Sequence, residues 1–171
     1  MKKMKHTKVL ATVMLVCVLI GSLKLPVEAA FVSINTWNLV DSSKHSDWNG
    51  STKYSARFNK AVITWNIHKV GVIRKTTSTS GADVTISDYY KNNNVAGVTS
   101  SAGTIKFNTF KMDGYTKKQR RNVCTHELGH ALGLAHNYSG DVMYTYVSKV
   151  VTLSLNDKAS YDAAYLKYST F

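Results

Sequence analysis

The order of apolar and polar positions along the chain predicts one helix, then several strands, then two further helices. Phe58, Val62 and Trp65 recur at helical spacing and predict a helix from about Thr52 to His68. Shorter apolar runs predict strands at residues 31–40, 70–76, 82–87 and 104–110, with a polar turn region at 41–50 and a polar loop at 88–94. This order implies a mixed sheet backed by helices, which is an α+β fold.

A further helix is expected over residues 117–132, and both of its ends are marked. Thr116 and Gln119 fit a capping box, although a polar loop after Gly114 is an alternative. Gly133 can take the left-handed conformation that ends a helix. The apolar residues of the segment share one face, which we expect to be buried: Val123, Cys124, Leu128, Ala131 and Leu132.

Three histidines and a glutamate lie in this helix and just after it. In a helix His126 and His130 are one turn apart, about 6 Å along the axis, so both rings can reach one ion. Glu127 points about 100° further round and can reach a water molecule in the open position of that ion. Once the helix stops at Gly133, the chain can bring His136 back as a third ligand.

This donor set predicts one catalytic zinc ion with Glu127 as general base. Three neutral nitrogen ligands leave a position for water, whereas a structural zinc more often has four protein ligands. His45 and His68 are the other histidines after residue 30, and they are too few for a second histidine cluster. An aspartate as the third ligand in place of His136 is the alternative, with these candidates: Asp141, Asp157 and Asp162.

In its zinc motif and three further segments the chain resembles the metzincin zinc endopeptidases, and within them the matrixin-like branch. Asp141-Val142-Met143-Tyr144 is similar to the methionine turn of that group and follows His136 at a short, matrixin-like spacing. Residues 154–168 are similar to its C-terminal helix, and residues 82–108 to the strands before its active-site helix. An ordinary core methionine is the alternative for Met143.

The resemblance implies a twisted mixed sheet of about five strands with three helices. It places a zinc cleft between the sheet with its active-site helix and a C-terminal subdomain. Extended substrate is expected along Ala96, Gly97 and Val98, with Tyr144 and Tyr146 contributing to the specificity pocket. An aromatic ring packed in a loop is the alternative for each tyrosine.

The first thirty residues predict a secretory signal peptide. Four lysines precede an apolar core at residues 9–23, and small side chains follow near Ala29, so cleavage is expected after Ala29 or Ala30. The apolar core is shorter than the about 20 residues that a spanning helix needs, so no transmembrane anchor is expected; a retained anchor is the alternative. Residues 31–171 then form a single catalytic domain outside the cell.

Removal of residues 1–30 takes away five lysines and one glutamate and lowers the net charge from +12 to +8. Glu127 is then the only glutamate, which excludes a zinc protease whose third ligand is a downstream glutamate. Cys124 is then the only cysteine, so it cannot form an internal disulfide and is expected to be a buried core thiol. Calcium is an open possibility that the sequence does not indicate, because no calcium-loop spacing links the scattered aspartates: Asp41, Asp47, Asp83, Asp88 and Asp113.

Together these features predict a secreted zinc-dependent endopeptidase that acts as a monomer on protein or peptide substrates, with no specific nucleic-acid partner. The alternative is a secreted basic protein with a vestigial or structural zinc site that binds anionic cell-wall or membrane polymers. The densest basic cluster, which could hold the protein at a cell surface, contains Lys117, Lys118, Arg120 and Arg121. This cluster is also typical of the solvated start of a helix.

Overall fold

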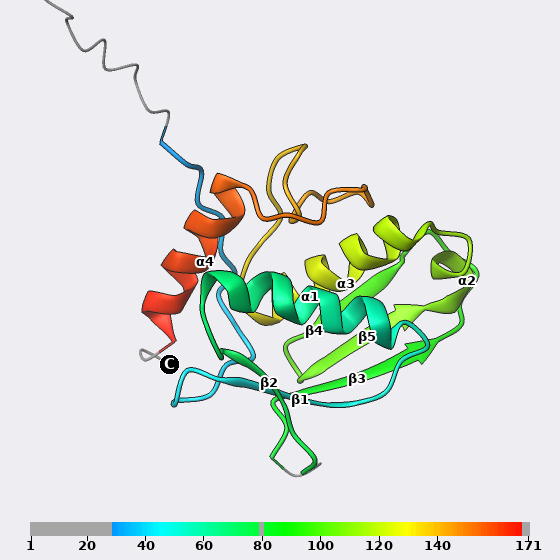
Figure 1. The fold of residues 1–171 in the computed structure, drawn as a ribbon, viewed down its shortest axis with the longest axis horizontal. Helices are drawn as coiled ribbons and strands as arrows, with labels where there is room; N and C mark the ends of the chain where they lie inside the picture. The colour runs from blue at the N-terminus through cyan, green and yellow to red at the C-terminus, as the bar shows by residue number, and fades with distance from the viewer. Residues whose placement is uncertain (1–28, 79–80, 169–171) are drawn as a thin grey trace, which may run out of the picture.

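A five-stranded mixed sheet carries the fold in the computed structural model, which describes residues 29–78 and 81–168 (Figure 1). The strands are β1 (Ser46–Gly50), β2 (Ile73–Lys75), β3 (Val84–Tyr89), β4 (Gly97–Ser100) and β5 (Thr104–Asn108). They lie in the order β2-β1-β3-β5-β4, and all neighbours are parallel except β4, which runs antiparallel to β5. β4 is therefore an edge strand, and the predicted α+β fold with a five-stranded mixed sheet is confirmed.

Three long helices and one short turn accompany the sheet. They are α1 (Ser55–His68), α2 (Thr109–Met112), α3 (Lys117–Ala131) and α4 (Leu155–Lys167). α1 and α3 cover one face of the sheet, whereas α4 lies beyond the C-terminal end of α1 (Figure 1). The rings of Trp65 in α1 and Tyr161 in α4 join these two helices, with centroids 5.4 Å apart.

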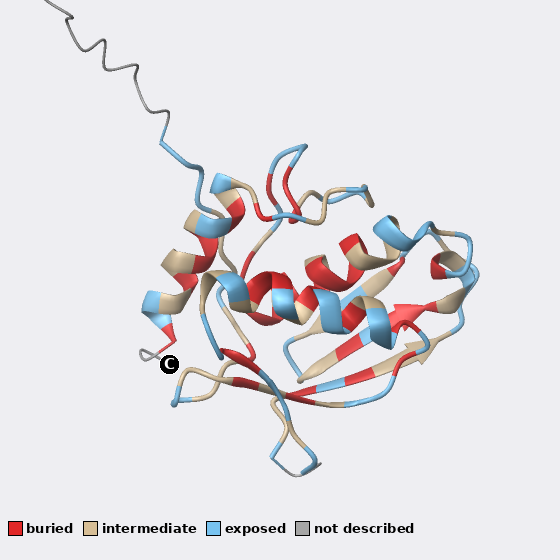
Figure 2. Ribbon diagram, viewed as in Figure 1, coloured by how far each residue is buried: buried red, intermediate tan, exposed pale blue. Residues whose placement is uncertain are grey.

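The core lies between the two covering helices and the sheet (Figure 2). Phe58 of α1 contacts Trp48 of β1 and Phe107 of β5, with ring centroids 4.9 and 6.1 Å away. Trp65 is fully buried, and its indole N–H donates to the carbonyl of Thr125 at 2.8 Å. This bond fixes α1 against α3 at the level of the predicted zinc ligands.

The segment before the sheet differs from its prediction as a strand. Residues 31–40 form only a single bridge, between Ile34 and Leu134. They run instead along the end of α3, where the N–H of Asn35 donates to the carbonyl of Gly133 at 2.7 Å. The end of a helix leaves carbonyls without partners, and this segment satisfies them.

The polar turn region predicted at residues 41–50 contains β1, so that prediction is wrong. Trp48 and Ser46 point to the buried side, whereas Asp47 and Asn49 are only partly buried. With a single large apolar side chain, β1 is defined by backbone pairing to strands on both sides and not by an apolar pattern.

The remaining predicted elements are found with shifted bounds. The helix predicted at 52–68 begins at Ser55, the strand at 70–76 covers 73–75, and the strand at 82–87 covers 84–89. The strand at 104–110 ends at Asn108, whose side chain accepts the N–H of Phe110 and starts α2. This single turn is a fourth helix beyond the three expected.

Both predicted ends of α3 are confirmed. The Thr116 hydroxyl accepts the N–H of Gln119, and the Gln119 side chain accepts the N–H of Thr116. Gly133 has a φ of 88°, and its N–H donates to the carbonyl of His130 at 2.9 Å. The predicted buried face is also confirmed at Val123, Cys124, Leu128, Ala131 and Leu132.

Ala29 and Ala30 are the only residues of the predicted signal peptide that fall within the described ranges. Among the helices of residues 29–78 and 81–168, none combines the length and apolar composition required to cross a membrane.

Candidate functional site

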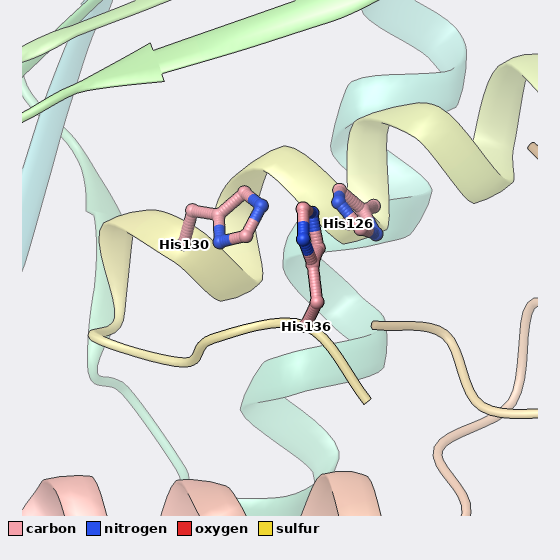
Figure 3. Close-up of side chains that lie close together, drawn as sticks. All are labelled: His126, His130 and His136. Atoms are coloured by element: carbon pink, nitrogen blue, oxygen red, sulfur yellow. The ribbon is translucent and has the colours of Figure 1, made fainter. Parts of the chain in front are cut away.

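Three histidine rings meet beside the C-terminal end of α3 (Figure 3). His126 and His130 project from successive turns of α3, and His136 reaches them from the segment that follows the helix. A ring nitrogen of each lies within 4.8 Å of those of the other two, and the ring centroids are 4.6 to 5.2 Å apart. The structure therefore brings the three predicted ligands together, because the chain reverses at Gly133.

Backbone carbonyls orient two of these rings. Nδ1 of His126 lies 3.0 Å from the carbonyl oxygen of Val142, and Nδ1 of His130 lies 2.8 Å from that of Leu134. A carbonyl oxygen only accepts hydrogen bonds, so each Nδ1 carries the hydrogen and each Nε2 keeps its lone pair. Burial lowers the pKa of His126 to about 3, with a further contribution from His130, and burial also lowers the pKa of His130.

Neutral imidazole nitrogens of this kind are the ligands that zinc prefers, so the three residues fit the ion. Backbone carbonyls on the far nitrogen are the usual partners that fix the ring of a metal-binding histidine. His136 is exposed, whereas the other two histidines are half-buried. The position opposite the three rings opens onto a cavity, which leaves room for water and substrate.

Glu127 lies against the edge strand β4. Its Oε2 accepts a hydrogen bond from the Thr99 hydroxyl at 2.6 Å. A Cβ atom at Gly97 would come within 2.7 Å of Glu127 Oε1, so the missing side chain of Gly97 leaves room for the carboxylate. Burial raises the pKa of Glu127 to about 7, and the bond from Thr99 opposes this rise. A carboxyl group with a pKa near neutrality can both accept and donate a proton at physiological pH.

Met143 packs against α3 between its two histidine turns. Met143 is fully buried, and a Cβ atom at Gly129 would lie 2.3 Å from its sulfur, so the contact depends on glycine at that position. The N–H groups of Val142 and Met143 donate to the carboxylate of Asp157 at 2.9 and 3.1 Å. Asp157 also belongs to the capping box that begins α4, so the first turn of α4 holds the turn that carries Met143.

A cavity of about 760 Å³ lies in front of the histidines and Glu127. All five residues predicted to bind substrate or to shape its pocket line it: Ala96, Gly97, Val98, Tyr144 and Tyr146. Seven further lining residues were not predicted: Val95, Thr99, Lys111, Tyr115, Val123, Thr145 and Val147. Thr99 could have been found, because it follows Gly97 by two positions in a strand and faces the same side.

The polar loop at residues 88–94 contributes only its last residue, Asn94, to this cavity. Asp88 lies elsewhere and accepts hydrogen bonds from the Thr52 hydroxyl and the Lys53 N–H, at 2.5 and 2.7 Å. Asp88 and Tyr89 belong to β3, so the loop begins later than predicted, and the Asp88 bonds join the end of β3 to the segment before α1.

The basic cluster at the start of α3 is partly engaged inside the protein. Arg120 donates to two backbone carbonyls at the end of α2, at 2.8 and 2.5 Å, and Arg121 donates to the Thr64 hydroxyl at 2.9 Å. Lys117 and Lys118 are exposed. Half of the cluster is therefore structural, and only the two lysines form a solvated helix start.

Cys124 is a buried core thiol, as predicted. It is fully buried and unpaired, and burial raises the pKa of its thiol above the usual range. A thiol in that state is a poor nucleophile and a poor metal ligand.

Three of the aspartates that are scattered in the sequence converge near the opposite edge of the sheet. Carboxylate oxygens of Asp41, Asp47 and Asp83 lie within 4.8 Å of one another. Asp47 pairs with Arg74 through bonds of 2.7 and 2.9 Å, and Asp83 accepts the N–H of Asp47 at 2.7 Å. Asp41 accepts the N–H of His45 at 2.8 Å. Sequence spacing gave no indication of this convergence.

Comparisons with known proteins bear on part of this site. The sequence profile of the Matrixin family of peptidases matches residues 101–166, a range that contains α3, the three histidines and Met143. No curated protein matches the sequence. The fold is similar to that of a chain in the "GM1 bound form of the ECX AB5 holotoxin", with 14% identity and a TM-score of 0.50 over 81% of this chain and 87% of that chain. The profile indicates a metalloprotease and a zinc ion at the level of the family, and the structural likeness shows the fold alone.

Proposed function

We propose that the protein is a zinc-dependent endopeptidase of the matrixin-like type with a metzincin-like fold. The observation that carries the proposal is the convergence of His126, His130 and His136 on a cavity of about 760 Å³ that also contains the buried Glu127. The match of the matrixin profile to residues 101–166 supports it. In this proposal the cleft lies between the sheet with α3 and the C-terminal segment that follows Gly133.

The three histidines would hold the zinc ion through ring nitrogens, while backbone carbonyls keep two of the rings in place. When bound, zinc supplies Lewis acidity that polarises a peptide carbonyl and lowers the pKa of a water molecule. Glu127 accepts a proton from the attacking water and delivers it to the departing amine nitrogen. Thr99 and Gly97 position that carboxylate, one by a hydrogen bond and the other by leaving space.

The edge strand β4 offers backbone groups to an extended substrate. β5 pairs with one side of β4, so N–H and C=O groups on the other side are available to a peptide. Alternate side chains of that peptide would then point into the cavity. Other residues that line the cavity can pack against such a side chain: Tyr115, Val123, Tyr144, Tyr146 and Val147.

We further propose that the protein works outside the cell as a monomer. The arrangement of charge and apolar residues at positions 1–30 supports secretion, and the basic chain that remains could stay near an anionic surface. A monomer suffices because every proposed ligand and the base come from one chain.

Expression of the full chain in a secreting host tests these points together. Protein recovered from the medium should begin at Ala30 or Phe31, contain one zinc ion per chain and cut a diverse peptide library. A chelator and Glu127→Ala should each abolish cleavage. If zinc-loaded protein cuts no peptide, the protease proposal is wrong. Salt-dependent binding to an anionic polymer that survives Glu127→Ala would then support the alternative function.

A further inference from the structure

One lysine and one glutamate are the charged side chains that line the cleft beside the histidines, and the glutamate is buried. Lys111 of α2 lines the cavity in front of the histidines, and Glu127 is the only acidic residue among the lining residues. The Lys111 ammonium lies 3.3 Å from the Asn94 side-chain oxygen, and no carboxylate of residues 29–78 and 81–168 lies within 4.0 Å of it. By contrast, Lys53 and Lys69 are paired with aspartates at 2.8 and 2.5 Å.

On the other face of β4 the charged side chains are all basic. A second cavity of about 450 Å³ lies there, and Lys91 and Lys106 line it together with uncharged residues. Val98 of β4 pairs in register with Lys106 of β5, and both side chains are exposed on this outer face. Val95 and Val98 line both cavities, so the two hollows flank one short stretch of the edge strand.

An extended peptide added to β4 would place its side chains alternately on these two faces. Side chains on one face would approach the histidines and Lys111, and those on the other would approach Lys106 and Lys91. The exposed apolar surface of Val98, which is 45% exposed, would be covered by the peptide in either case. Both faces offer lysine ammonium groups, and Glu127 is buried against Thr99, so an acidic peptide meets complementary charge on each side.

From this placement we infer that the protein selects extended peptide segments that carry acidic side chains, with Lys111 as the specificity-determining residue inside the cleft. This inference rests on the proposed peptidase function and adds the class of substrate. A single partly exposed ion pair changes binding by up to about fivefold, so the preference is a bias and not an absolute requirement.

Matched peptides test the inference. One peptide that the wild-type protein cuts is made with Glu, Gln or Lys at each position flanking the cleaved bond. At the position that meets Lys111, kcat/KM should be about fivefold higher for Glu than for Gln and lowest for Lys, and the difference should shrink as salt is raised. Lys111→Gln should remove the preference, and Lys111→Glu should reverse it. Lys60→Glu is the matched control, because Lys60 is exposed on α1 and lines neither cavity.

The outcomes separate this inference from the proposed function. Equal kcat/KM for the three peptides, or a preference unaffected by Lys111→Glu, would overturn the acidic selectivity and leave the peptidase intact. If no peptide is cut, binding of the same peptides to Glu127→Ala, followed by fluorescence anisotropy, still measures the preference. Binding of anionic phospholipid vesicles that depends on Lys111, with no preference among peptides, would assign the surface to a membrane and reject the inference.

Discussion

Within the described part of the chain, two groups of three potential metal ligands assemble, and they differ in what their donor atoms already bind. Each of the three histidines has a nitrogen near the common centre, while backbone carbonyls hold the opposite nitrogens of two rings. The aspartate group of Asp41, Asp47 and Asp83 is equally close together, but its oxygens already accept bonds from Arg74 and from backbone N–H groups. Proximity alone therefore does not make a metal site.

The surroundings of the two groups differ as well. The histidines open onto a cavity of about 760 Å³, with a buried carboxyl group beside them. Burial raises the pKa of Asp83, while the bond from the Asp47 N–H lowers it and the nearby Asp41 carboxylate raises it again. The lowered pKa values of His126 and His130 keep these two rings neutral, whereas the carboxylates of the aspartate group repel one another and lie beside the Arg74 guanidinium.

The largest expected difference between the two groups is in zinc binding and activity when one member of each is removed. His136→Ala is expected to abolish stoichiometric zinc binding and to lower kcat/KM at least about 10³-fold, because a ligand of the Lewis acid is lost. Asp41→Asn should leave both unchanged. Elemental analysis measures the zinc content, and a peptide-cleavage assay measures kcat/KM. Circular dichroism checks that both variants are folded. Equal zinc loss in the two variants would contradict the comparison.

The Glu127→Gln variant should still bind zinc but should lose most of its peptide-cleaving activity. The amide has nearly the same shape but cannot accept a proton, so kcat/KM is expected to fall by about 10² to 10⁴-fold while zinc content stays at one ion per chain. A variant that loses zinc as well would indicate that Glu127 supports the ligands and does not act only as a base.

The Gly97→Ala substitution in β4 should displace the Glu127 carboxylate. The added Cβ would meet Glu127 Oε1 at 2.7 Å, and displacement of the base is expected to lower kcat by roughly 10 to 100-fold without loss of zinc. Gly114→Ala is the matched control, because its Cβ would meet only the Lys111 carbonyl at 3.7 Å. Wild-type kcat in Gly97→Ala would show that β4 does not constrain Glu127.

The smallest expected effect is the difference between zinc and calcium in how far each raises the Tm of the metal-depleted protein. Zinc at about 100 times its Kd adds about 2.7 kcal/mol to the free energy of unfolding, which raises Tm by roughly 5 to 10 °C. Millimolar calcium is expected to shift Tm by less than about 1 °C, because Asp47 is already paired with Arg74. A larger calcium shift that disappears in Asp83→Asn would show that the aspartates do bind a cation.

The helix that carries the site, α3, was predictable because the residues that determine it lie close together in the sequence. The capping box at Thr116, the glycine at 133 and the spacing of His126 and His130 all lie within one helix and its ends. Glu127 was predictable as a base from the same spacing. The support from Thr99 was not predicted, although strand alternation from Gly97 implies it.

The missed features depend on pairing between distant segments. β1 has only one large apolar side chain and is defined by strands on both sides. Residues 31–40 have an apolar pattern like that of a strand, but they bond the end of α3, where the helix leaves its last carbonyls without partners. Asp41, Asp47 and Asp83 meet because the sheet brings them together, and no sequence spacing records that contact.

The bonds from Val142 and Met143 to Asp157 also have a consequence for biosynthesis. The chain is made from its N-terminus, so α3 and its two histidines exist before α4 has been synthesised. The segment of His136 is joined to the Met143 turn by the bond from the Asn137 N–H to the Met143 carbonyl, at 2.8 Å, and that turn is held by Asp157. A chain that ends at Ser154 should therefore bind zinc more weakly than the full chain, as a titration would show. In the proposed protease, His136 would be held in place only after α4 has docked, so we expect peptide cleavage to begin only after α4 has been synthesised.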